Sequence, residues 1–160
     1  MHAVSGAPVR VGLISDTHGL LRPQALAALS GCHQIIHAGD IGGVAILDAL
    51  RAIAPVTAVR GNNDKGAWAD RIPESAVLQV GAIRIYVIHD LAGIDLDPAA
   101  AGFRVVVAGH SHKPSREMRE GVLYINPGSA GPRRFSLPVA VARLEIAGTN
   151  IAPQLIELAV

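Results

Sequence analysis

Two histidines one residue apart close an apolar run in the second half of the chain. The sequence Gly109-His110-Ser111-His112 follows Val105–Ala108, a run typical of a buried strand. Successive side chains of a strand point to opposite faces, but a turn directly after the strand can aim both imidazole rings at one point. Imidazole is the commonest protein ligand of transition metals. The pair therefore indicates a metal site at the end of a strand.

Further potential metal ligands follow other apolar runs, and they are Asp16, His18, Asp40, Asn62, Asp64 and His89. In an open α/β sheet, ligands bind just beyond the carboxyl ends of the strands. A lone Asp there is more often a turn or cap residue, but the repetition favours one shared site. Two divalent ions about 3.5–4 Å apart need a bridging carboxylate and several further ligands. Mixed imidazole, carboxylate and amide ligands favour Mn²⁺, Fe²⁺ or Zn²⁺ over Ca²⁺ or Mg²⁺.

The elements that must position these residues alternate between strand and helix in the first half of the chain. We predict strands over Val9–Ser15, Gln34–Ala38 and Val56–Val59, and helices over Pro23–Leu29 and Gly42–Ile53. This order is typical of a parallel sheet with crossover helices. The second half predicts short strands, over Ala76–Val80, Ile83–Ile88, Val105–Ala108, Glu117–Arg119, Val122–Asn126, Val139–Ile146 and Ile151–Leu158. We therefore expect two packed sheets with helices outside, in a single domain over residues 1–160.

The composition excludes several classes of protein. Half of the residues (50%) are hydrophobic, so disorder is not expected, and the net charge of +1 gives no argument for nucleic acid or an anionic membrane as the main partner. Cys32 is the only cysteine, which excludes an internal disulfide and suits a reducing compartment; we expect a buried hydrophobe rather than a reactive thiol. Met1–Pro8 lacks a signal-peptide pattern, and no stretch approaches the roughly 20 apolar residues of a membrane span. We expect a cytoplasmic protein.

The motifs in their order resemble those of the calcineurin-like metallophosphoesterases, and most of all the short, cap-free phosphodiesterase branch of bacteria and archaea. The resemblance rests on Asp16-Thr17-His18, Gly39-Asp40, Gly61-Asn62-Asn63-Asp64, His89, Gly109-His110-Ser111-His112 and Asn126-Pro127-Gly128-Ser129. It implies a four-layer αββα sandwich of two mixed β-sheets flanked by helices. This α/β (α+β) architecture agrees with the expected elements.

The resemblance also implies a ligand set and a reaction. Asp16, His18 and His112 would hold one metal ion, Asn62, His89 and His110 would hold the second, and Asp40 would bridge both. The implied catalytic residues are Asp40, Asn62, Asp64 and His89, although a turn cap is an equal alternative for Asp64. The cofactor would be two Mn²⁺ ions, with Fe²⁺, Zn²⁺ or Ni²⁺ as alternatives. The substrate would be a small phosphoester attacked by a metal-bridging hydroxide.

Two positions depart from the family pattern. Asn63 stands where many members carry a histidine that is thought to protonate the leaving group, and an amide cannot act as an acid at neutral pH. This predicts a preference for good leaving groups, such as those of aryl phosphodiesters. Asp90 stands where glycine is expected, either as an extra acid or histidine partner, or as a cap before Leu91–Gly93. The segment Leu91–Gly102 is short, which predicts an open cleft.

Several other polar and aromatic residues have two interpretations each. His37 is either a core histidine or a support for the metal ligands. Arg133 and Arg134 either meet substrate phosphate or carry surface charge. Trp68 could wall the cleft, contact another subunit or anchor its loop. His2 and His33 are expected to be exposed.

Two other functions compete with the enzyme. A scaffold on the same fold is the first, because the eukaryotic retromer scaffold subunit resembles this family yet lacks a full ligand set. Here every expected ligand is present. A nucleotide-binding Rossmann domain is disfavoured, since no glycine-rich phosphate-binding motif follows the first strand. A homo-oligomer, dimer or tetramer, is an open alternative to a monomer.

Overall fold

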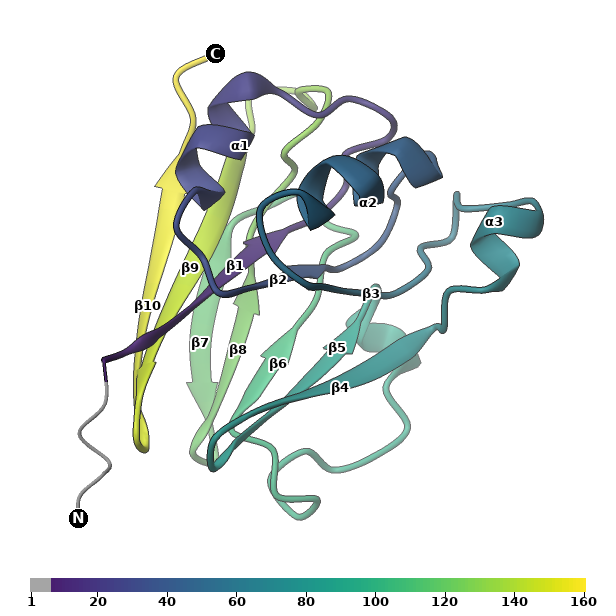
Figure 1. Cartoon of the computed structure of the whole chain (residues 1–160). Coiled ribbons are helices and arrows are strands. Elements are labelled where there is room, and N and C mark those ends of the chain that lie inside the picture. The colour runs from purple at the N-terminus through teal and green to yellow at the C-terminus, as the bar shows by residue number, and fades with distance from the viewer. Residues whose placement is uncertain (1–6) are drawn as a thin grey trace.

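Two mixed five-stranded sheets face each other in the computed structural model, which describes residues 7–160 (Figure 1). The first sheet has the order β10-β9-β1-β2-β3 and consists of β1 (Val9–Ile14), β2 (Gln34–His37), β3 (Val56–Ala58), β9 (Ala140–Ala147) and β10 (Asn150–Glu157). The second has the order β4-β5-β6-β8-β7 and consists of β4 (Ser75–Val80), β5 (Ile83–Ile88), β6 (Val105–Val107), β7 (Ser115–Arg119) and β8 (Val122–Asn126). The predicted two-sheet sandwich is confirmed. His2 and most of Met1–Pro8 lie outside the described residues.

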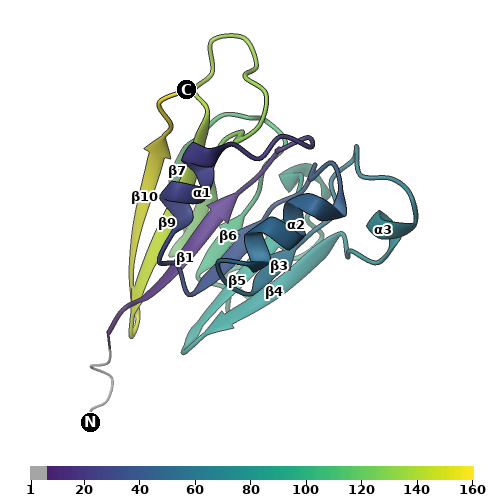
Figure 2. The same ribbon diagram turned by 45° about the horizontal axis from the view of Figure 1, so that its top comes forward.

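Helices α1 (Pro23–Leu29) and α2 (Val44–Arg51) lie on the outer face of the first sheet (Figure 2). Helix α1 has the predicted bounds, because Pro23 fits the first turn of a helix. Helix α2 is shorter than predicted, since Gly42 has a positive φ of 98° and Gly43 is extended. The four-residue helix α3 (Ala67–Asp70) was not predicted, because one turn carries no periodicity. Within residues 7–160 no helix is long and apolar enough to cross a membrane.

Parallel pairing brings the strand ends of each sheet to one edge. In the first sheet β1 pairs in parallel with β2, and β2 with β3. In the second sheet β5, β6 and β8 are parallel neighbours, which the sequence pattern did not predict. The loops after all these strands therefore leave the sandwich at the carboxyl ends of parallel strands, where α/β proteins build their sites.

The core is aliphatic and lies mainly between the two sheets. Leu13 and Ile36 of the first sheet pack with Ile85 and Val105 of the second, and all four side chains are fully buried. Helices α1 and α2 close a second apolar cluster on the outer face of the first sheet. That cluster contains Cys32, whose burial raises the pKa of its thiol, as expected for a structural cysteine.

The outer face of the second sheet is covered by the connection between β5 and β6. Ile94, Leu96 and Phe103 of this segment pack on Tyr86 and Val106. Its helical part is a single 3₁₀ turn, η2 (Leu91–Gly93), so this outer layer is thinner than the one that α1 and α2 form. A short covering layer leaves the neighbouring strand ends open, in agreement with the open cleft that the sequence predicts.

We predict that Val105→Ala lowers the free energy of unfolding by about 2 kcal/mol, because it removes buried methyl groups and leaves a cavity. The matched control is Val77→Ala in β4 of the same sheet, where the side chain is 50% exposed. Urea denaturation measures both variants. Equal losses would show that the inter-sheet cluster does not dominate the stability of the second sheet.

Candidate metal centre

The loops that follow the parallel strands are joined to one another by backbone hydrogen bonds. The N–H groups of Asp16 and His18 donate to the carbonyls of Gly39 and Asp40, both at 2.9 Å. The loop after β6 joins the loop after β5 through Gly109 N–H and the His89 carbonyl, at 3.0 Å. These bonds fix the backbone from which the predicted ligands project.

Five of the predicted ligands have a left-handed backbone conformation. The φ angles are 55° at Asp16, 46° at His18, 55° at Asp40, 74° at His110 and 63° at His112. In residues 7–160, only Glu120 and Phe135 share this conformation among residues other than glycine. Positive φ is uncommon for residues with a side chain and concentrates at functional sites. The turn after each strand thus bends sharply enough to redirect its side chain.

Glycines let these loops approach closely. A Cβ atom on Gly109 would lie 2.7 Å from Asp16 Oδ2, and one on Gly39 would lie 2.6 Å from His89 Nδ1. A Cβ on Gly61 would lie 2.8 Å from Asp40 Cγ. Real Cβ atoms do not make such contacts, so each glycine before a predicted ligand is required by the neighbouring loop.

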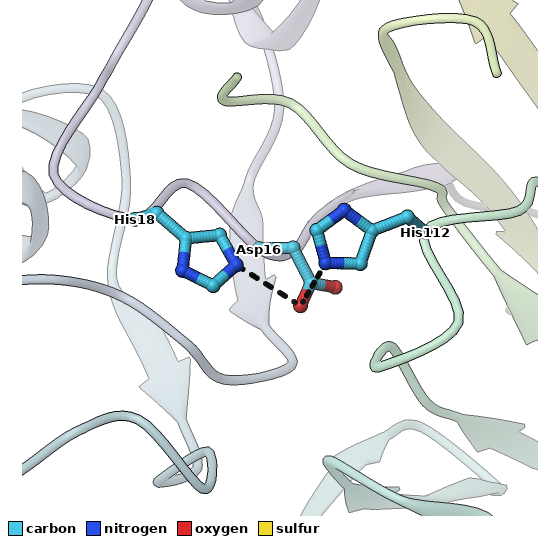
Figure 3. A group of neighbouring side chains, drawn as sticks. All are labelled: Asp16, His18 and His112. Atoms are coloured by element: carbon cyan, nitrogen blue, oxygen red, sulfur yellow. Dashed lines mark ion pairs between the residues drawn. The ribbon is translucent and has the colours of Figure 1, made fainter. Parts of the chain in front are cut away.

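Asp16, His18 and His112 form one compact group (Figure 3). Asp16 Oδ1 lies 3.8 Å from His18 Nε2 and 3.4 Å from His112 Nε2. The two imidazole rings stack on each other with their centroids 5.3 Å apart. The group thus joins two loops that are nearly a hundred residues apart in the sequence.

Asp16, Asp40 and His89 form a second group that shares Asp16 with the first. His89 Nε2 lies 3.4 Å from Asp40 Oδ2 and 4.0 Å from Asp16 Oδ1. Asp40 Oδ2 also lies 3.7 Å from His18 Nε2. Asp40 therefore stands between histidines of both groups, which is the position that a bridging carboxylate needs.

The donor atoms of both groups fit a divalent cation. In residues 7–160, Asp16 Oδ1, His18 Nε2 and His89 Nε2 are buried, have no hydrogen-bond partner and lie beside one another, and His112 Nε2 faces the same Asp16 oxygen. Buried polar atoms are nearly always partnered, so unpartnered atoms that converge point to a cation site. Their separations of 3.4–4.0 Å are too long for hydrogen bonds. Ligands about 2.1 Å from one ion lie roughly 3–3.4 Å apart, so a small adjustment would seat an ion.

Asn62 and His110, the remaining predicted ligands, lie at the rim of this cluster. Asn62 is exposed in the turn after β3. The His110 side chain is 47% exposed, and its ring meets that of His89 edge-on, with the centroids 5.3 Å apart. Nε2 of His110 faces Asp90 Oδ2 at 3.6 Å rather than the close groups. The structure therefore gathers five of the seven predicted ligands and leaves two beside them.

Two hollows open beside the cluster, and Asp90 lines both of them. One has a volume of about 400 Å³, contains His110 and Asn126 and extends over the outer face of the second sheet to Arg119 and Tyr124. The other has a volume of about 280 Å³ and is lined by Asn62 and His89, among others. The cleft is thus open on two sides. A larger hollow of about 550 Å³ lies between β7 and β10, at the opposite end of the strands.

The sequence identifies Asn63 only as a position without a general acid, but in the structure this residue makes two hydrogen bonds to the Asp40 carboxylate. Its backbone N–H donates to Asp40 Oδ1 at 2.9 Å and its side-chain amide donates to Oδ2 at 3.1 Å. Burial alone would raise the pKa of Asp40, but the adjacent His89 ring and the hydrogen bond from the Asn63 N–H outweigh it and hold the pKa well below its usual range. Asp40 is therefore ionised. No sequence pattern indicates this contact, because residues 40 and 63 become neighbours only through the pairing of β2 with β3.

Asp64 caps two loops. Its carboxylate oxygens accept from the N–H groups of Gly61 at 2.9 Å, Ile41 at 2.9 Å and Gly42 at 3.0 Å. The side chain is 5% exposed and ties the loop after β2 to the loop after β3. These contacts correspond to the cap, the structural one of the two roles expected for Asp64.

His37 is oriented by two hydrogen bonds on the core side of the cluster. His37 Nδ1 accepts from Gly39 N–H at 3.1 Å. Its Nε2–H donates at 2.9 Å to Thr17 Oγ1, because the Thr17 hydroxyl itself donates to the Ile41 carbonyl at 2.7 Å. Burial lowers the pKa of His37 to about 3, so it is neutral. It is a core histidine that supports two ligand loops, and thus combines both of its expected roles.

The hydrogen bond to His89 determines which of its ring nitrogens carries the proton. His89 Nδ1 lies 2.7 Å from the Ala38 carbonyl and must donate to it. The unpartnered Nε2 is then the nitrogen available to a cation. Burial lowers the pKa of His89, but the nearby Asp40 carboxylate and the hydrogen bond to the Ala38 carbonyl outweigh it and raise the pKa.

The Asn126–Ser129 segment supports the turn that carries His110 and His112. Asn126 Nδ2 donates to the Gly109 carbonyl at 3.0 Å and to Ser111 Oγ at 3.1 Å. Ser129 Oγ donates to the Asp16 carbonyl at 3.0 Å. This segment, which the sequence predicts as a tight turn, therefore lies behind the cluster and joins it to β8.

The remaining candidates lie farther out. Arg133 and Arg134 are exposed, and the charge of Arg134 together with burial lowers the pKa of His112. Arg134 is thus within electrostatic reach of the cluster. Trp68 packs on the apolar cluster under α2, which supports its role as a loop anchor. His33 is exposed as expected.

We predict that Asp64→Ala lowers the free energy of unfolding by about 3 kcal/mol, because three N–H groups lose a charged acceptor. Asp48→Ala, at an exposed position of α2, is the matched control and should change it by less than about 1 kcal/mol. Urea denaturation of both variants tests this. An unchanged Asp64→Ala variant would contradict the capping role.

Similar proteins of known sequence are named as metallophosphoesterases. The chain is 34% identical over 139 residues to a probable metallophosphoesterase of Methanocaldococcus jannaschii, with 79% of this chain and 70% of the relative covered. It is 31% identical over 158 residues to a probable metallophosphoesterase of Methanothermobacter thermautotrophicus, with 91% of each covered. A protein of M. jannaschii named phosphodiesterase is 26% identical over 139 residues, with 75% of this chain and 83% of the relative covered.

Solved structures share the fold at lower identity. Vacuolar protein sorting 29 from Cryptosporidium parvum has a TM-score of 0.77 and 19% identity, with 95% of this chain and 100% of that chain covered. The zinc complex of the Entamoeba histolytica protein of the same name has a TM-score of 0.71 and 22% identity, with 93% and 99% covered. The profile of the calcineurin-like phosphoesterase superfamily domain matches residues 9–149, which include every loop of the cluster. The chain therefore belongs to the calcineurin-like phosphoesterase superfamily.

Proposed function

We propose that this protein is a binuclear metal-dependent phosphodiesterase. One observation carries the proposal: the unpartnered, buried oxygen and nitrogen atoms of Asp16, His18 and His89 converge beside the ionised Asp40. Such a cluster has no role in stability, since buried carboxylates without partners are unfavourable. It suits cations that a substrate can reach, and family membership supports phosphoester hydrolysis as the reaction.

The proposed ligand set combines the residues of the two close groups with Asn62 and His110 at their rim. Asp16, His18 and His112 would hold the first ion, and Asp40 would bridge to the second. The second ion would be completed by the set Asn62, His89 and His110. Mixed imidazole, carboxylate and amide donors favour Mn²⁺, with Fe²⁺, Zn²⁺ or Ni²⁺ as alternatives. When bound, the ions supply positive charge for the phosphoryl oxygens and lower the pKa of the attacking water.

The chain's own residues fix the geometry of this reaction. Asn63 holds both oxygens of Asp40, and Ala38 fixes the tautomer of His89. Ligands held in place before substrate binds need no reorganisation during the reaction.

A diester is the proposed substrate class because the cleft is open on two sides. The hollows of about 400 Å³ and 280 Å³ flank Asp90 and give room for two ester groups on one phosphorus. The hollow of about 400 Å³ is lined by Tyr124 and Arg119, an aromatic and a cationic side chain. The relative named phosphodiesterase supports the same class.

A scaffold remains the second candidate function. The structural neighbours named vacuolar protein sorting 29 share the whole fold, with a TM-score of 0.77 in one case. A scaffold would show no turnover with two ions bound. A homo-oligomeric state and a cytoplasmic location stay predictions from the sequence.

The metal assignment predicts that Asp40→Asn abolishes binuclear loading. Purified wild-type protein incubated with Mn²⁺ should retain two ions per chain by elemental analysis, and Asp40→Asn at most one, because an amide cannot bridge two cations. Hydrolysis of bis(4-nitrophenyl) phosphate should fall at least about 100-fold, as for the loss of a charged catalytic group. Asp48→Asn, a conservative change at an exposed aspartate in α2, is the control. Full loading and activity in Asp40→Asn would refute the proposal.

The absence of an acid at Asn63 predicts a steep dependence of rate on the leaving group. General acid catalysis is typically worth about 10²–10⁴-fold, and it matters most for poor leaving groups. We expect kcat/KM for aryl methyl phosphodiesters to fall steadily as the pKa of the leaving phenol rises, and simple alkyl monoesters to be very poor substrates. Asn63→His should flatten this dependence if the new imidazole reaches the leaving group. Rapid turnover of alkyl monoesters by the wild type would contradict the prediction.

A further inference from the structure

We propose that Asp90 is a positioning residue for His110. In this assignment the Asp90 carboxylate accepts from Nε2–H of His110, so that the other ring nitrogen, Nδ1, is presented to the second metal ion. The inference rests on the proposed function, because it needs His110 to be a metal ligand. It concerns this chain in particular, since glycine is the residue expected at position 90.

The Asp90 carboxylate has one oxygen fixed and one oxygen free to meet His110. Oδ1 accepts from the Ala92 N–H at 3.0 Å and thereby caps the 3₁₀ turn η2. Oδ2 lies 3.6 Å from His110 Nε2. The cap holds the Asp90 side chain in an orientation that keeps the second oxygen beside the imidazole ring.

His110 needs such a partner more than the other histidines of the cluster. Its side chain is 47% exposed, whereas those of His89 and His112 are 5% and 6% exposed. His89 has its non-ligand nitrogen fixed by the Ala38 carbonyl at 2.7 Å. Asp90 is placed to do the same for His110. Both histidines of the second ion would then be oriented through the nitrogen that does not bind it.

The negative charge of Asp90 would also strengthen the binding of a metal ion by His110. A carboxylate hydrogen-bonded to a metal-bound imidazole raises its basicity, and such partners are typically worth about 10–100-fold in metal affinity. Without an ion, the pair contributes little, because both side chains are about half exposed and water screens them. Asp90 should therefore matter for ion binding and hardly at all for stability.

Calorimetric titration with Mn²⁺ tests the proposal on three variants. Asp90→Ser keeps a hydroxyl oxygen for the Ala92 N–H but cannot reach His110, and it should weaken the second ion about 10–100-fold while the first is unchanged. Asp90→Asn keeps the cap without the charge and should give an intermediate loss. Asp97→Ser is the matched control, because Asp97 caps Ala100 on the same segment at 3.3 Å, and it should bind both ions as the wild type does. Thermal unfolding without metal should be the same for all variants.

Combining Asp90→Ser with His110→Ala distinguishes a positioning role of Asp90 from direct metal binding by Asp90. There Asp90→Ser should cause no further loss of affinity, because its target is absent. An equal loss in both backgrounds would overturn the proposal and make Asp90 a direct ligand, and wild-type affinity in Asp90→Ser would overturn it as well. If His110→Ala itself leaves the second ion unaffected, or the wild type binds no second ion, the ligand set of the proposed function fails instead.

Nitrogen NMR of the ring in the Zn²⁺-loaded protein gives an independent readout. The His110 ring of the wild type should carry its proton on Nε2 and bind the ion through Nδ1. A proton on Nδ1, with Nε2 bound to the ion, would overturn the assignment without any mutation.

Discussion

Burial of two carboxylates at neighbouring strand ends is the constraint on which the site depends. Asp16 is fully buried and Asp40 is 3% exposed. Taking an ionised carboxylate out of water costs several kcal/mol unless partners compensate. Asp16 Oδ2 accepts from Ser15 Oγ at 2.7 Å and from the His110 N–H at 3.1 Å, while Oδ1 faces only histidine nitrogens. The fold therefore holds partly compensated negative charge, which a bound cation would compensate further.

The strands, turns and glycines around the site hold these buried carboxylates in place. Parallel strands in both sheets bring their carboxyl ends to one edge, and the aliphatic core between the sheets fixes the spacing of those ends. Left-handed turns then redirect the ligand side chains, and glycines such as Gly39 and Gly109 allow the loops to touch. Unfavourable backbone conformations of this kind persist only where the surrounding structure stabilises them. Asp64, His37 and Asn126 supply that stabilisation through hydrogen bonds to the loop backbones.

The site has a buried part and an exposed part. Asp16 and His112 of the first group are buried, and His18 is partly exposed. Asn62 and His110 lie on the exposed side, where the hollows begin. This division suits the proposed binuclear centre, with one ion in the buried part and the other next to the substrate. In that proposal, Asp90 would influence the second ion without affecting the fold, because it lies on the exposed side.

Local sequence patterns were enough to predict most of the strands and helices and the candidate residues at the strand ends. Alternation of apolar runs with Asp-x-His, Gly-Asp and Gly-His-x-His predicted the strands, the two sheets and the residues at their ends, because these signals are local. Three features emerge only in the folded chain: β5, β6 and β8 are parallel neighbours, Asn63 holds Asp40, and His110 lies beside Asp90. Each of them joins segments that are separated in the sequence. Their geometry depends on strand order and register, which arise from packing of the whole chain and leave no periodic trace in the sequence.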